Sequence, residues 1–446
     1  MMKYNTYKPS ENQWFKQVPL HWETFRFIDK VFLKHGFQFR DYDFTDEGIK
    51  VIKITQLNPD GSLDTDNCSF IDSARLGEFK SIKISEGDIL MALTGGTIGK
   101  IIRVGKVREP LLQNYRVGNF FPNKKALDKT YLYFLLSSQI TEEQINYLLN
   151  RNGQPNIGKE SFKNMFFPLP PFEEQSQIAQ YLEVKAQAID KKVSLLTKKA
   201  DYYKDLRKSI INDSVCKGLD KNVKQQVSEF AFSVNANWKR YRLKDLGFLY
   251  SGLSGKAGDD FNQDDNPNNK GFIPFTNIAN NTYLKANHLG SVVVFENEKQ
   301  NKVRKGDLFF LMSSEGYDDV GKTAALAEDI PDTYLNSFCK GYRITKKNCE
   351  PYFLNYLLLS DNYRKSLITE GKGFTRINLK MEKVTDFFVY LPATKEEQTA
   401  IANFLDEKTQ KIDAIISNIG KQIKTLKELR KTLINDVVTG KIKVTE

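Results

Sequence analysis

Two long stretches of the chain carry the hydrophobic spacing of coiled-coil helices. The first, from Phe172 to Lys217, contains no glycine or proline, and the second, from Ala393 to Thr439, contains only Gly420. Apolar residues recur three or four positions apart in both, which predicts helices of about 40 residues that bury one stripe. The stripe positions correspond one to one: Ile189, Val193, Leu196, Ala200, Tyr203, Leu206 and Ile210 in the first stretch, and Ile412, Ile416, Ile419, Ile423, Leu426, Leu429 and Leu433 in the second.

The two stretches are copies of one sequence, 223 positions apart. A period near half the chain length is too long for a solenoid, in which repeats of roughly 20 to 50 residues stack. It indicates two copies of a whole module. The identical pairs include Ile178/Ile401, Leu182/Leu405, Ile189/Ile412, Asp190/Asp413, Arg207/Arg430, Asn212/Asn435 and Asp213/Asp436.

A fainter repeat precedes each helix. Trp22 aligns with Trp238, and the Gly87-Asp88 pair aligns with Gly306-Asp307. Leu-Leu-Ser also occurs in both halves, at residues 135–137 and 358–360. The globular segments have diverged while the helices have not, which indicates a shared role for the helices and separate roles for the two globular segments.

The helix starts have recognisable signals. Thr394 and Glu397 have the spacing of a capping box, and Pro171 can occupy a first turn, where its missing N–H costs nothing. An amphipathic helix of this length must bury its stripe, and two tandem copies separated by a globular domain can pack antiparallel. Packing of each helix on its own domain, or on a partner in a homodimer, is the alternative.

Composition agrees with a folded protein of several domains. The 446 residues are 40% hydrophobic and 12% aromatic, with a net charge of +11. The basic balance is compatible with nucleic-acid binding but also with a lysine-rich soluble protein. Neither a membrane-spanning apolar run nor a secretory leader is expected. Four cysteines without CxxC spacing favour a reducing cytoplasm; they are Cys68, Cys216, Cys339 and Cys349.

The motifs at both helices resemble a known family. Each helix opens with EEQ-x-x-I-A, at residues 173–179 and 396–402, and closes with LRK-x-x-IND-x-V, at residues 206–215 and 429–438. A PxxW element from Pro19 to Trp22, with a weaker relative at residues 236–238, opens each half. Together these motifs are similar to those of the specificity (S) subunits of type I restriction-modification systems.

The resemblance implies a fold and a division of labour. We expect a mixed α/β chain with two target recognition domains separated by two long helices in an antiparallel coiled coil. Each domain would read one half of a bipartite site in double-stranded DNA, and the coiled coil would set their spacing. Two adenine-modification (methyltransferase) subunits would dock on the helices, and restriction (translocase and endonuclease) subunits would join them in defence against foreign DNA. The chain itself would be noncatalytic and without cofactor or metal.

The expected boundaries follow from the motifs. They are an N-terminal arm (1–17), the first recognition domain (18–169), the central spacer helix (170–219), a linker (220–235), the second recognition domain (236–391), the C-terminal spacer helix (392–441) and a tail (442–446).

Three strings suggest enzymes instead. Residues 316–323 match the GxxxxGK[ST] pattern of a P-loop, but Asp318 and Asp319 would repel phosphate, and the duplicated counterpart at residues 95–101 ends in isoleucine. A β-hairpin in both halves explains the pair better.

Leu169-Pro-Pro-Phe172 lacks the polar residue of an amino-methyltransferase loop and indicates a helix start. Pro59-Asp60 with Glu78-Phe-Lys80 has nuclease-like spacing, although Asn-Pro-Asp-Gly is first a turn. His21, His35 and His288 lack metal-ligand spacing.

Base readout requires polar side chains on rigid elements. The candidates are Arg40, Tyr42, Gln154 and Asn156 in the first half and Lys256, Lys372, Thr375, Arg376 and Asn378 in the second. The other functions left open are a nonenzymatic coiled-coil scaffold and, third, a nuclease or nucleotide-dependent enzyme. Site-specific adenine methylation that requires this chain would distinguish a DNA-reading specificity subunit from both of these alternatives.

Overall fold

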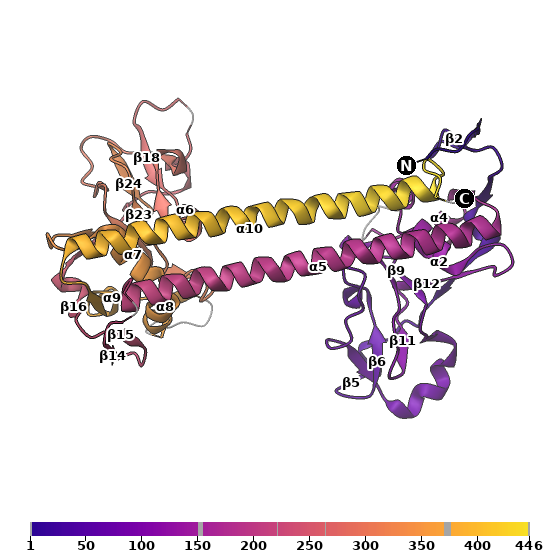
Figure 1. Ribbon diagram of the computed structural model, residues 1–446, viewed down its shortest axis with the longest axis horizontal. Helices are drawn as coiled ribbons and strands as arrows, with labels where there is room; N and C mark the ends of the chain where they lie inside the picture. Colours follow the sequence, from indigo (N-terminus) through magenta and orange to yellow (C-terminus); the bar gives the residue numbers. More distant parts are fainter. Residues whose placement is uncertain (1, 150–154, 221, 264, 370–375, 445–446) are drawn as a thin grey trace. The chain divides into compact units, whose positions relative to one another are not determined.

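The structure is a computed structural model that describes residues 2–149, 155–220, 222–263, 265–369 and 376–444. The chain divides into two compact units. Unit 1 comprises Met1–Thr197 and Lys421–Glu446, and unit 2 comprises Lys198–Gly420. Each unit therefore contains one globular domain together with a segment of both long helices (Figure 1). None of the described helices combines the length and the apolar character needed to cross a membrane.

The globular part of unit 1 is built on two sheets. One has the strand order β10-β9-β12-β4, and the other has the order β5-β7-β6-β11-β8, in which β6 and β11 are parallel. Two further pairs, β1 with β2 and β3 with β13, are antiparallel. The strands are β1 (Tyr7–Pro9), β2 (Gln17–Pro19), β3 (Glu23–Arg26), β4 (Val31–His35), β5 (Phe44–Thr45), β6 (Ile49–Ile52), β7 (Ser69–Ile71), β8 (Lys83–Ile84), β9 (Ile89–Ala92), β10 (Ile101–Arg103), β11 (Leu111–Gln113), β12 (Val117–Pro122) and β13 (Phe166–Leu169).

Unit 2 repeats this plan with changes. Its main sheet has the order β17-β25-β21-β23-β19, and a smaller sheet has the order β20-β18-β24, in which β18 and β24 are parallel. The strands are β14 (Gln225–Val227), β15 (Ser233–Asn235), β16 (Lys239–Arg242), β17 (Gly247–Ser251), β18 (Asn269–Ile273), β19 (Tyr283–Leu284), β20 (Gly290–Val293), β21 (Leu308–Leu311), β22 (Ser313–Ser314), β23 (Thr323–Leu326), β24 (Thr333–Leu335), β25 (Cys339–Ile344), β26 (Ile377–Asn378) and β27 (Phe388–Leu391).

Short helices pack against the sheets of both units. In unit 1 they are α1 (Phe27–Lys30), α2 (Lys129–Leu136), α3 (Gln139–Leu148) and α4 (Lys159–Phe162). In unit 2 they are α6 (Phe275–Asn280), α7 (Pro351–Leu359), α8 (Asp361–Ile368) and α9 (Met381–Thr385). The Leu-Leu-Ser repeats of the sequence lie at the ends of α2 and α7, so the weak repeat marks equivalent helices.

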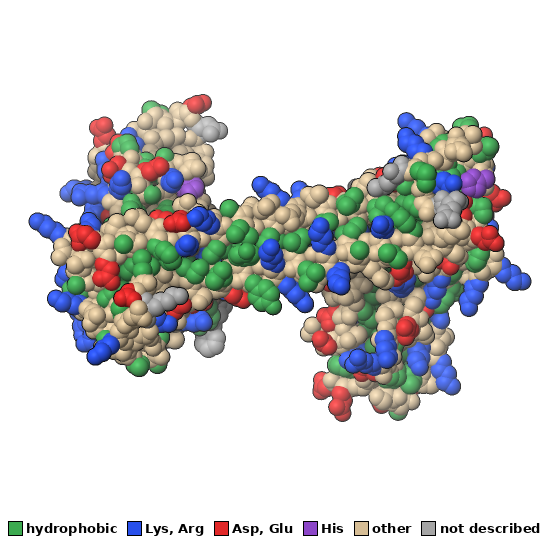
Figure 2. Space-filling model, in the orientation of Figure 1, with side chains coloured by type: hydrophobic (Ala, Val, Ile, Leu, Met, Phe, Trp, Pro, Cys, Tyr) green, Lys and Arg blue, Asp and Glu red, His purple; other side chains and the backbone are tan. Residues whose placement is uncertain are grey.

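The two predicted long helices are present. Helix α5 spans Phe172–Lys217 and α10 spans Lys395–Val438. The hydroxyl of Thr394 accepts a hydrogen bond from the backbone N–H of Glu397 (3.2 Å), which is the Thr394 half of the predicted capping box. The helices pack antiparallel, as expected. In each unit, hydrophobic side chains lie between the two helix segments and lysines and arginines flank them (Figure 2).

The seam differs from the expected stripe at one repeated position. Leu206 and Leu429 are 46% and 47% exposed, whereas the next residues, Arg207 and Arg430, are partly buried. The stripe therefore keeps a regular four-three alternation by passing through the arginines. The other predicted seam residues are buried or half-buried: Ile189, Val193, Leu196 and Ile210 on α5, and Ile412, Ile416, Ile419, Leu426 and Leu433 on α10.

Each seam arginine reaches an aspartate on the other helix. Within unit 1, Arg430 Nε lies 2.9 Å from Asp190 Oδ1. Within unit 2, Arg207 Nε lies 3.0 Å from Asp413 Oδ1. All four residues belong to identical pairs of the sequence repeat, so the cross-helix ion pair is itself repeated.

Two residues of the repeated EEQ motif join each helix to its domain. Glu174 accepts a hydrogen bond from the indole N–H of Trp22 (3.0 Å), and Glu397 accepts the same bond from Trp238 (3.1 Å). Gln175 follows Glu174 and is buried, and its Oε1 accepts from the backbone N–H of Asp128 (2.9 Å). Gln398 does the same for the backbone N–H of Glu350 (2.8 Å) in unit 2. The motif therefore fixes the start of each helix against its own domain.

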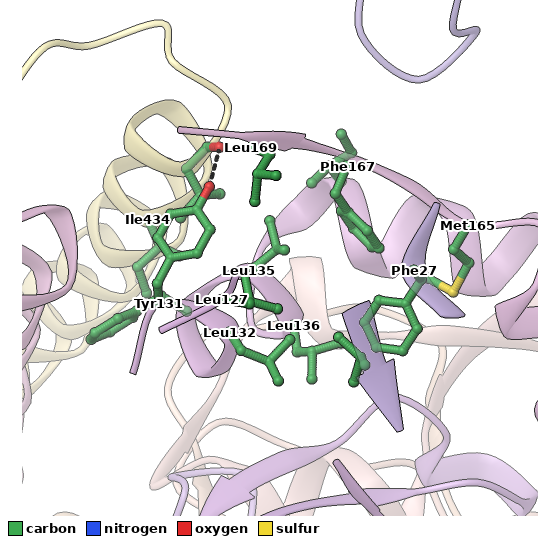
Figure 3. Packing of buried hydrophobic residues seen from close by; sticks show 14 of the residues in the cluster. Phe27, Leu127, Tyr131, Leu132, Leu135, Leu136, Met165, Phe167, Leu169 and Ile434 are labelled. Carbon is green, nitrogen blue, oxygen red and sulfur yellow. Dashed lines mark hydrogen bonds between the residues drawn. The ribbon is translucent and has the colours of Figure 1, made fainter. Parts of the chain in front are cut away.

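The core of unit 1 includes the end of α10. Ile434 packs beside Tyr131 of α2 (Figure 3), and Leu433, Val437 and Val438 belong to the same buried cluster. The Tyr131 hydroxyl donates a hydrogen bond to the backbone carbonyl of Val438 (3.3 Å). In unit 2 the end of α5 has this place, through Ile211, Val215 and Cys216. The core of each domain is thus completed by the tail of the helix that belongs to the other repeat.

Candidate nucleic-acid interface

A hairpin with a glycine-containing connection occurs in both units. Strand β9 pairs antiparallel with β10 in unit 1, and β21 pairs antiparallel with β23 in unit 2, which confirms the predicted hairpins. Gly99 and Gly321 have φ values of 79° and 75°, a left-handed conformation that glycine adopts without steric cost. We name the two connections, residues 93–100 and 312–322, the hairpin loops.

The aspartates of the repeated Gly-Asp pair support these hairpins. Asp88 is 5% exposed and accepts hydrogen bonds from the backbone N–H of Ser85 and the side chain of Asn119, both at 2.9 Å. Asp307 is 2% exposed and accepts from Arg343 Nη2 and the Tyr250 hydroxyl, both at 2.6 Å. Burial raises the pKa of Tyr250, so its phenol remains a donor at neutral pH. These carboxylates are therefore structural.

In unit 1 two other segments lie against the hairpin loop. Leu93 is the centre: its N–H donates to the carbonyl of Arg116 (2.9 Å), and its carbonyl accepts from Ile157 (2.9 Å). Thr94 forms an isolated β-bridge with Asn156. The hairpin loop, the turn between β11 and β12 (residues 114–116) and the described segment 155–158 thus form one surface. We name it loop cluster 1.

Unit 2 brings the equivalent segments together. Ser313 of β22 pairs with Asn378 of β26, and the N–H of Leu379 donates to the carbonyl of Met312 (2.8 Å). The turn between β24 and β25 (residues 336–338) completes the group, because the guanidinium of Arg376 lies 5.5 Å from the centre of the Phe338 ring. We name these segments, residues 312–322, 336–338 and 376–379, loop cluster 2.

The DNA-binding candidates of the first half fall in different places. Arg40 and Tyr42 are both exposed, Tyr42 by 85%; Arg40 precedes the 3₁₀ helix Asp41–Asp43 and Tyr42 lies within it, outside loop cluster 1. Gln154 lies outside the described residues. Asn156 is exposed within loop cluster 1. A DNA contact by any of them stays a prediction.

The candidates of the second half also separate. Arg376 and Asn378 are exposed in loop cluster 2. Lys372 and Thr375 lie outside the described residues. Lys256 has a side chain only 6% exposed, and its Nζ lies 2.6 Å from Glu298 Oε1. The geometry thus gives Lys256 a structural partner, and it is the least accessible of the candidates that the structure describes.

Comparison with known proteins matches nearly the whole chain. A family model described as the type I restriction modification DNA specificity domain matches residues 19–199 and again residues 235–425. The chain belongs to this family. It is a DNA specificity subunit with two target recognition domains, one in each unit, and a recognition subunit rather than a catalytic one.

Individual relatives are distant. The specificity subunit of the type I restriction enzyme MjaVIII from Methanocaldococcus jannaschii is 27% identical over 215 residues, 48% of this chain. The chain spans about half (49%) of that relative's length in this match. The putative MjaX specificity subunit of the same organism is 22% identical over 412 residues, 89% of this chain and 88% of the relative.

Solved structures share the fold. A chain from a structural study of complex assembly and conformational transition in the type I R-M system is similar with a TM-score of 0.69 and 16% identity, covering 95% of this chain and 99% of that one. The HsdS subunit from Thermoanaerobacter tengcongensis has a TM-score of 0.51 at 15% identity, covering 96% and 99%.

Sequence reasoning missed several polar and aromatic residues of this specificity subunit's loop clusters. Tyr115 and Arg116 lie in loop cluster 1, and Phe338, which is 59% exposed, lies in loop cluster 2. The signal was faint but present, because Asn114 and Asn336 open both turns at equivalent places of the repeat. What the pattern could not give was the long-range contact between the turn and the hairpin loop.

The P-loop match in the second domain has another explanation. Residues 316–322 lie within the hairpin loop, and the chain continues into strand β23, whereas a P-loop continues into a helix. Lys322 Nζ lies 2.7 Å from Asp319 Oδ1 and donates to the carbonyl of Ala279 (3.2 Å). The lysine therefore ties the loop to its own domain.

The remaining enzyme-like strings are structural in the specificity subunit. Leu169 ends β13, and α5 begins at Phe172, so the Leu-Pro-Pro-Phe string is a helix start. Asp60 Oδ1 accepts hydrogen bonds from both the backbone N–H (3.0 Å) and the hydroxyl (2.6 Å) of Ser62 within a turn. Among the described residues, no group of three or more His, Cys, Asp or Glu side chains could hold a metal ion.

Proposed function

We propose that the chain is the DNA-reading subunit of a type I modification and restriction complex, in which each recognition domain reads one half of a bipartite double-stranded site. The observation that carries this is the repeat of one construction: a loop cluster in each domain, with each domain joined to the same position of a duplicated helix. Two similar surfaces of different composition suit two half-sites of different sequence. The paired helices would set the gap between them.

The partners are proposed from the repeat as well. Leu206 on α5 and Leu429 on α10 are equivalent residues, each about half exposed beside a seam arginine. Large apolar side chains exposed at the same place in both units support two equivalent docking surfaces. We assign them to two modification subunits, with restriction subunits joining the assembly. A complex of this kind would act in the cytoplasm, where the four cysteines remain free thiols as they are here.

Methylation mapping tests the function. The chain is expressed with an adenine methyltransferase that is encoded next to it. Methylated adenines are then located across the genome with and without the chain. We expect a bipartite motif with a fixed gap that requires the chain. A stable assembly that leaves methylation unchanged would instead support a nonenzymatic scaffold.

The docking surfaces have a separate test. Leu206→Glu and Leu429→Glu are each expected to remove one modification subunit, and the double variant both, as measured by the mass of the purified complex. Leu219→Glu is the matched control, because Leu219 is also exposed (44%) but lies beyond the end of α5. Full assembly of the double variant would contradict this docking site.

A further inference from the structure

Each loop cluster contains one arginine held against an aromatic ring. In loop cluster 1 the guanidinium carbon of Arg116 lies 5.3 Å from the centre of the Tyr115 ring, and Arg116 Nε donates to the Tyr115 hydroxyl (2.8 Å). In loop cluster 2, Arg376 lies 5.5 Å from the centre of the exposed Phe338 ring. Stacking on a ring restricts a guanidinium to one plane and leaves its N–H groups pointing outward in that plane.

Neither of these two arginines pairs with an acidic side chain among the residues that the structure describes. Arg75, Arg103 and Arg343 all make ion pairs within their own domains. For Arg116 and Arg376 no ion pair occurs with any residue that the structure describes. Their terminal Nη donors are thus available to an outside acceptor.

The two pairs are built from different segments at the same location. In the first domain the turn supplies both ring and arginine, Tyr115 and Arg116. In the second domain the equivalent turn supplies only the ring, Phe338, and the arginine is the residue directly before strand β26 (Ile377–Asn378). Arg116 and Phe338 occupy equivalent positions of the repeat. The guanidinium is therefore retained although its position in the sequence has moved.

We propose that Arg116 and Arg376 are specificity-determining residues, each of which reads a guanine in the half-site of its own domain; this rests on the proposed DNA-reading function. An arginine donates two parallel hydrogen bonds to O6 and N7 of guanine in the major groove, the commonest specific contact of this kind. The stacked ring fixes the orientation that these bonds require. Lysine keeps the charge but lacks the planar fork.

The experiment compares Arg116→Lys and Arg376→Lys with wild type in the full chain, coexpressed with its methyltransferase, by methylation mapping. We expect Arg116→Lys to lose about 10- to 100-fold discrimination at one G·C pair of one half-site, and Arg376→Lys at one G·C pair of the other. The unaffected half-site in each variant serves as an internal control. Arg108→Lys and Arg304→Lys are the matched controls, because both arginines are exposed outside the loop clusters.

The ring has its own test in the second domain. Phe338→Tyr keeps a stacking surface and should retain the motif, whereas Phe338→Ala should relax the same base pair as Arg376→Lys. Copurification with the methyltransferase and the unfolding temperature show that the variants fold. If a variant does not assemble, binding of its full chain to a library of DNA duplexes replaces the mapping.

The possible results distinguish failure of the proposed function from failure of the inference about Arg116 and Arg376. Absence of any bipartite motif with the wild-type chain would overturn the proposed function. A normal wild-type motif that persists unchanged in both lysine variants would overturn this inference alone. Uniform weakening at every sequence, with a smaller dependence on salt, would also overturn it, because it would identify the arginines as phosphate contacts.

Discussion

Asn435 on α10 accepts a hydrogen bond from the backbone N–H of Ile140, in the first turn of α3 (3.1 Å). Asn212 on α5 accepts the same bond from Asn362, in the first turn of α8 (3.2 Å). The serines at the cap positions do not cap these helices, because the hydroxyls of Ser138 and Ser360 bond to the preceding helix. Each recognition domain thus has one helix capped by the spacer helix of the other repeat.

Loss of this cap should destabilise unit 1. Asn435→Ala leaves the N–H of Ile140 buried without its partner, at an expected cost of about 1–2 kcal/mol. The measurement is urea-induced unfolding. Asn418→Ala is the control, since Asn418 is exposed on α10 and should cost less than about 0.5 kcal/mol. Equal stability of the two variants would contradict the capping role.

The cross-helix ion pairs should contribute little. Arg207 and Asp413 have side chains 29% and 54% exposed, so solvent screens their attraction. A double-mutant cycle with Arg207→Ala and Asp413→Ala should give a coupling of about 0.2–1 kcal/mol that decreases with added salt. A coupling above about 2 kcal/mol, or one insensitive to salt, would show that the pair is a main determinant of helix association.

Glu183 and Asp406 occupy the same position of the repeated helix but hold their domains by different chemistry. Arg103 Nη1 donates to Glu183 (2.8 Å), which lowers the pKa of that carboxyl below its usual 4.5. The hydroxyls of Tyr283 and Tyr356 donate to Asp406 at 2.8 and 2.7 Å, and burial raises the pKa of both tyrosines above 10. The two contacts therefore fail at opposite ends of the pH scale.

The direction in which each contact's contribution to stability changes with pH depends on whether the folded or the unfolded chain binds the proton more tightly. Unfolded Glu183 binds a proton more tightly than folded Glu183, so the advantage of wild type over Glu183→Gln should shrink as the pH falls below about 4.5. Folded Tyr283 holds its proton more tightly than the unfolded chain does, so the advantage over Tyr283→Phe should shrink as the pH rises past about 10. Unfolding in urea across the pH range measures both differences. A trend in the opposite direction would contradict the assigned cause.

Lys322→Ala should not reveal a nucleotide site. Because Lys322 bonds to Asp319 and Ala279 within its own domain, we expect ATP binding to the isolated chain to be undetectable in both wild type and variant. The hairpin loop should become more sensitive to protease. Equilibrium dialysis with labelled ATP measures binding, and tight binding by wild type that the variant abolishes would restore the P-loop interpretation.

The helices and their duplication could be predicted from the sequence because their evidence is local. A helical stripe repeats within a few residues, and identical pairs such as Asn212/Asn435 are visible at once. The detailed seam could not be fixed, because Leu206 and Arg207 both fit the spacing within one residue. Hydrophobicity favoured the leucine, and the regular alternation, with an aspartate available across the helix pair, placed the arginine there instead.

The loop clusters show the opposite limit. The sequence predicts DNA contacts by Asn156 and Arg376 because both lie in polar loops, but these loops are far along the chain from the hairpin loops they join. Tyr115 and Arg116 cannot be predicted in this way, because nothing in a short turn reveals which distant strand it will adjoin. Long-range strand pairing decides these positions, and a single sequence contains little information about it.

The two capping asparagines are synthesised at different times relative to the domains that they cap. Asn212 is synthesised 150 residues before Asn362, in the helix that it caps. The cap and part of the core of the second domain are therefore already present when that domain is synthesised. Asn435 is made 295 residues after Ile140, together with the Leu433–Val438 segment of the first core. The first domain to leave the ribosome is therefore the last to be finished, because its core stays open until the end of α10 has been made.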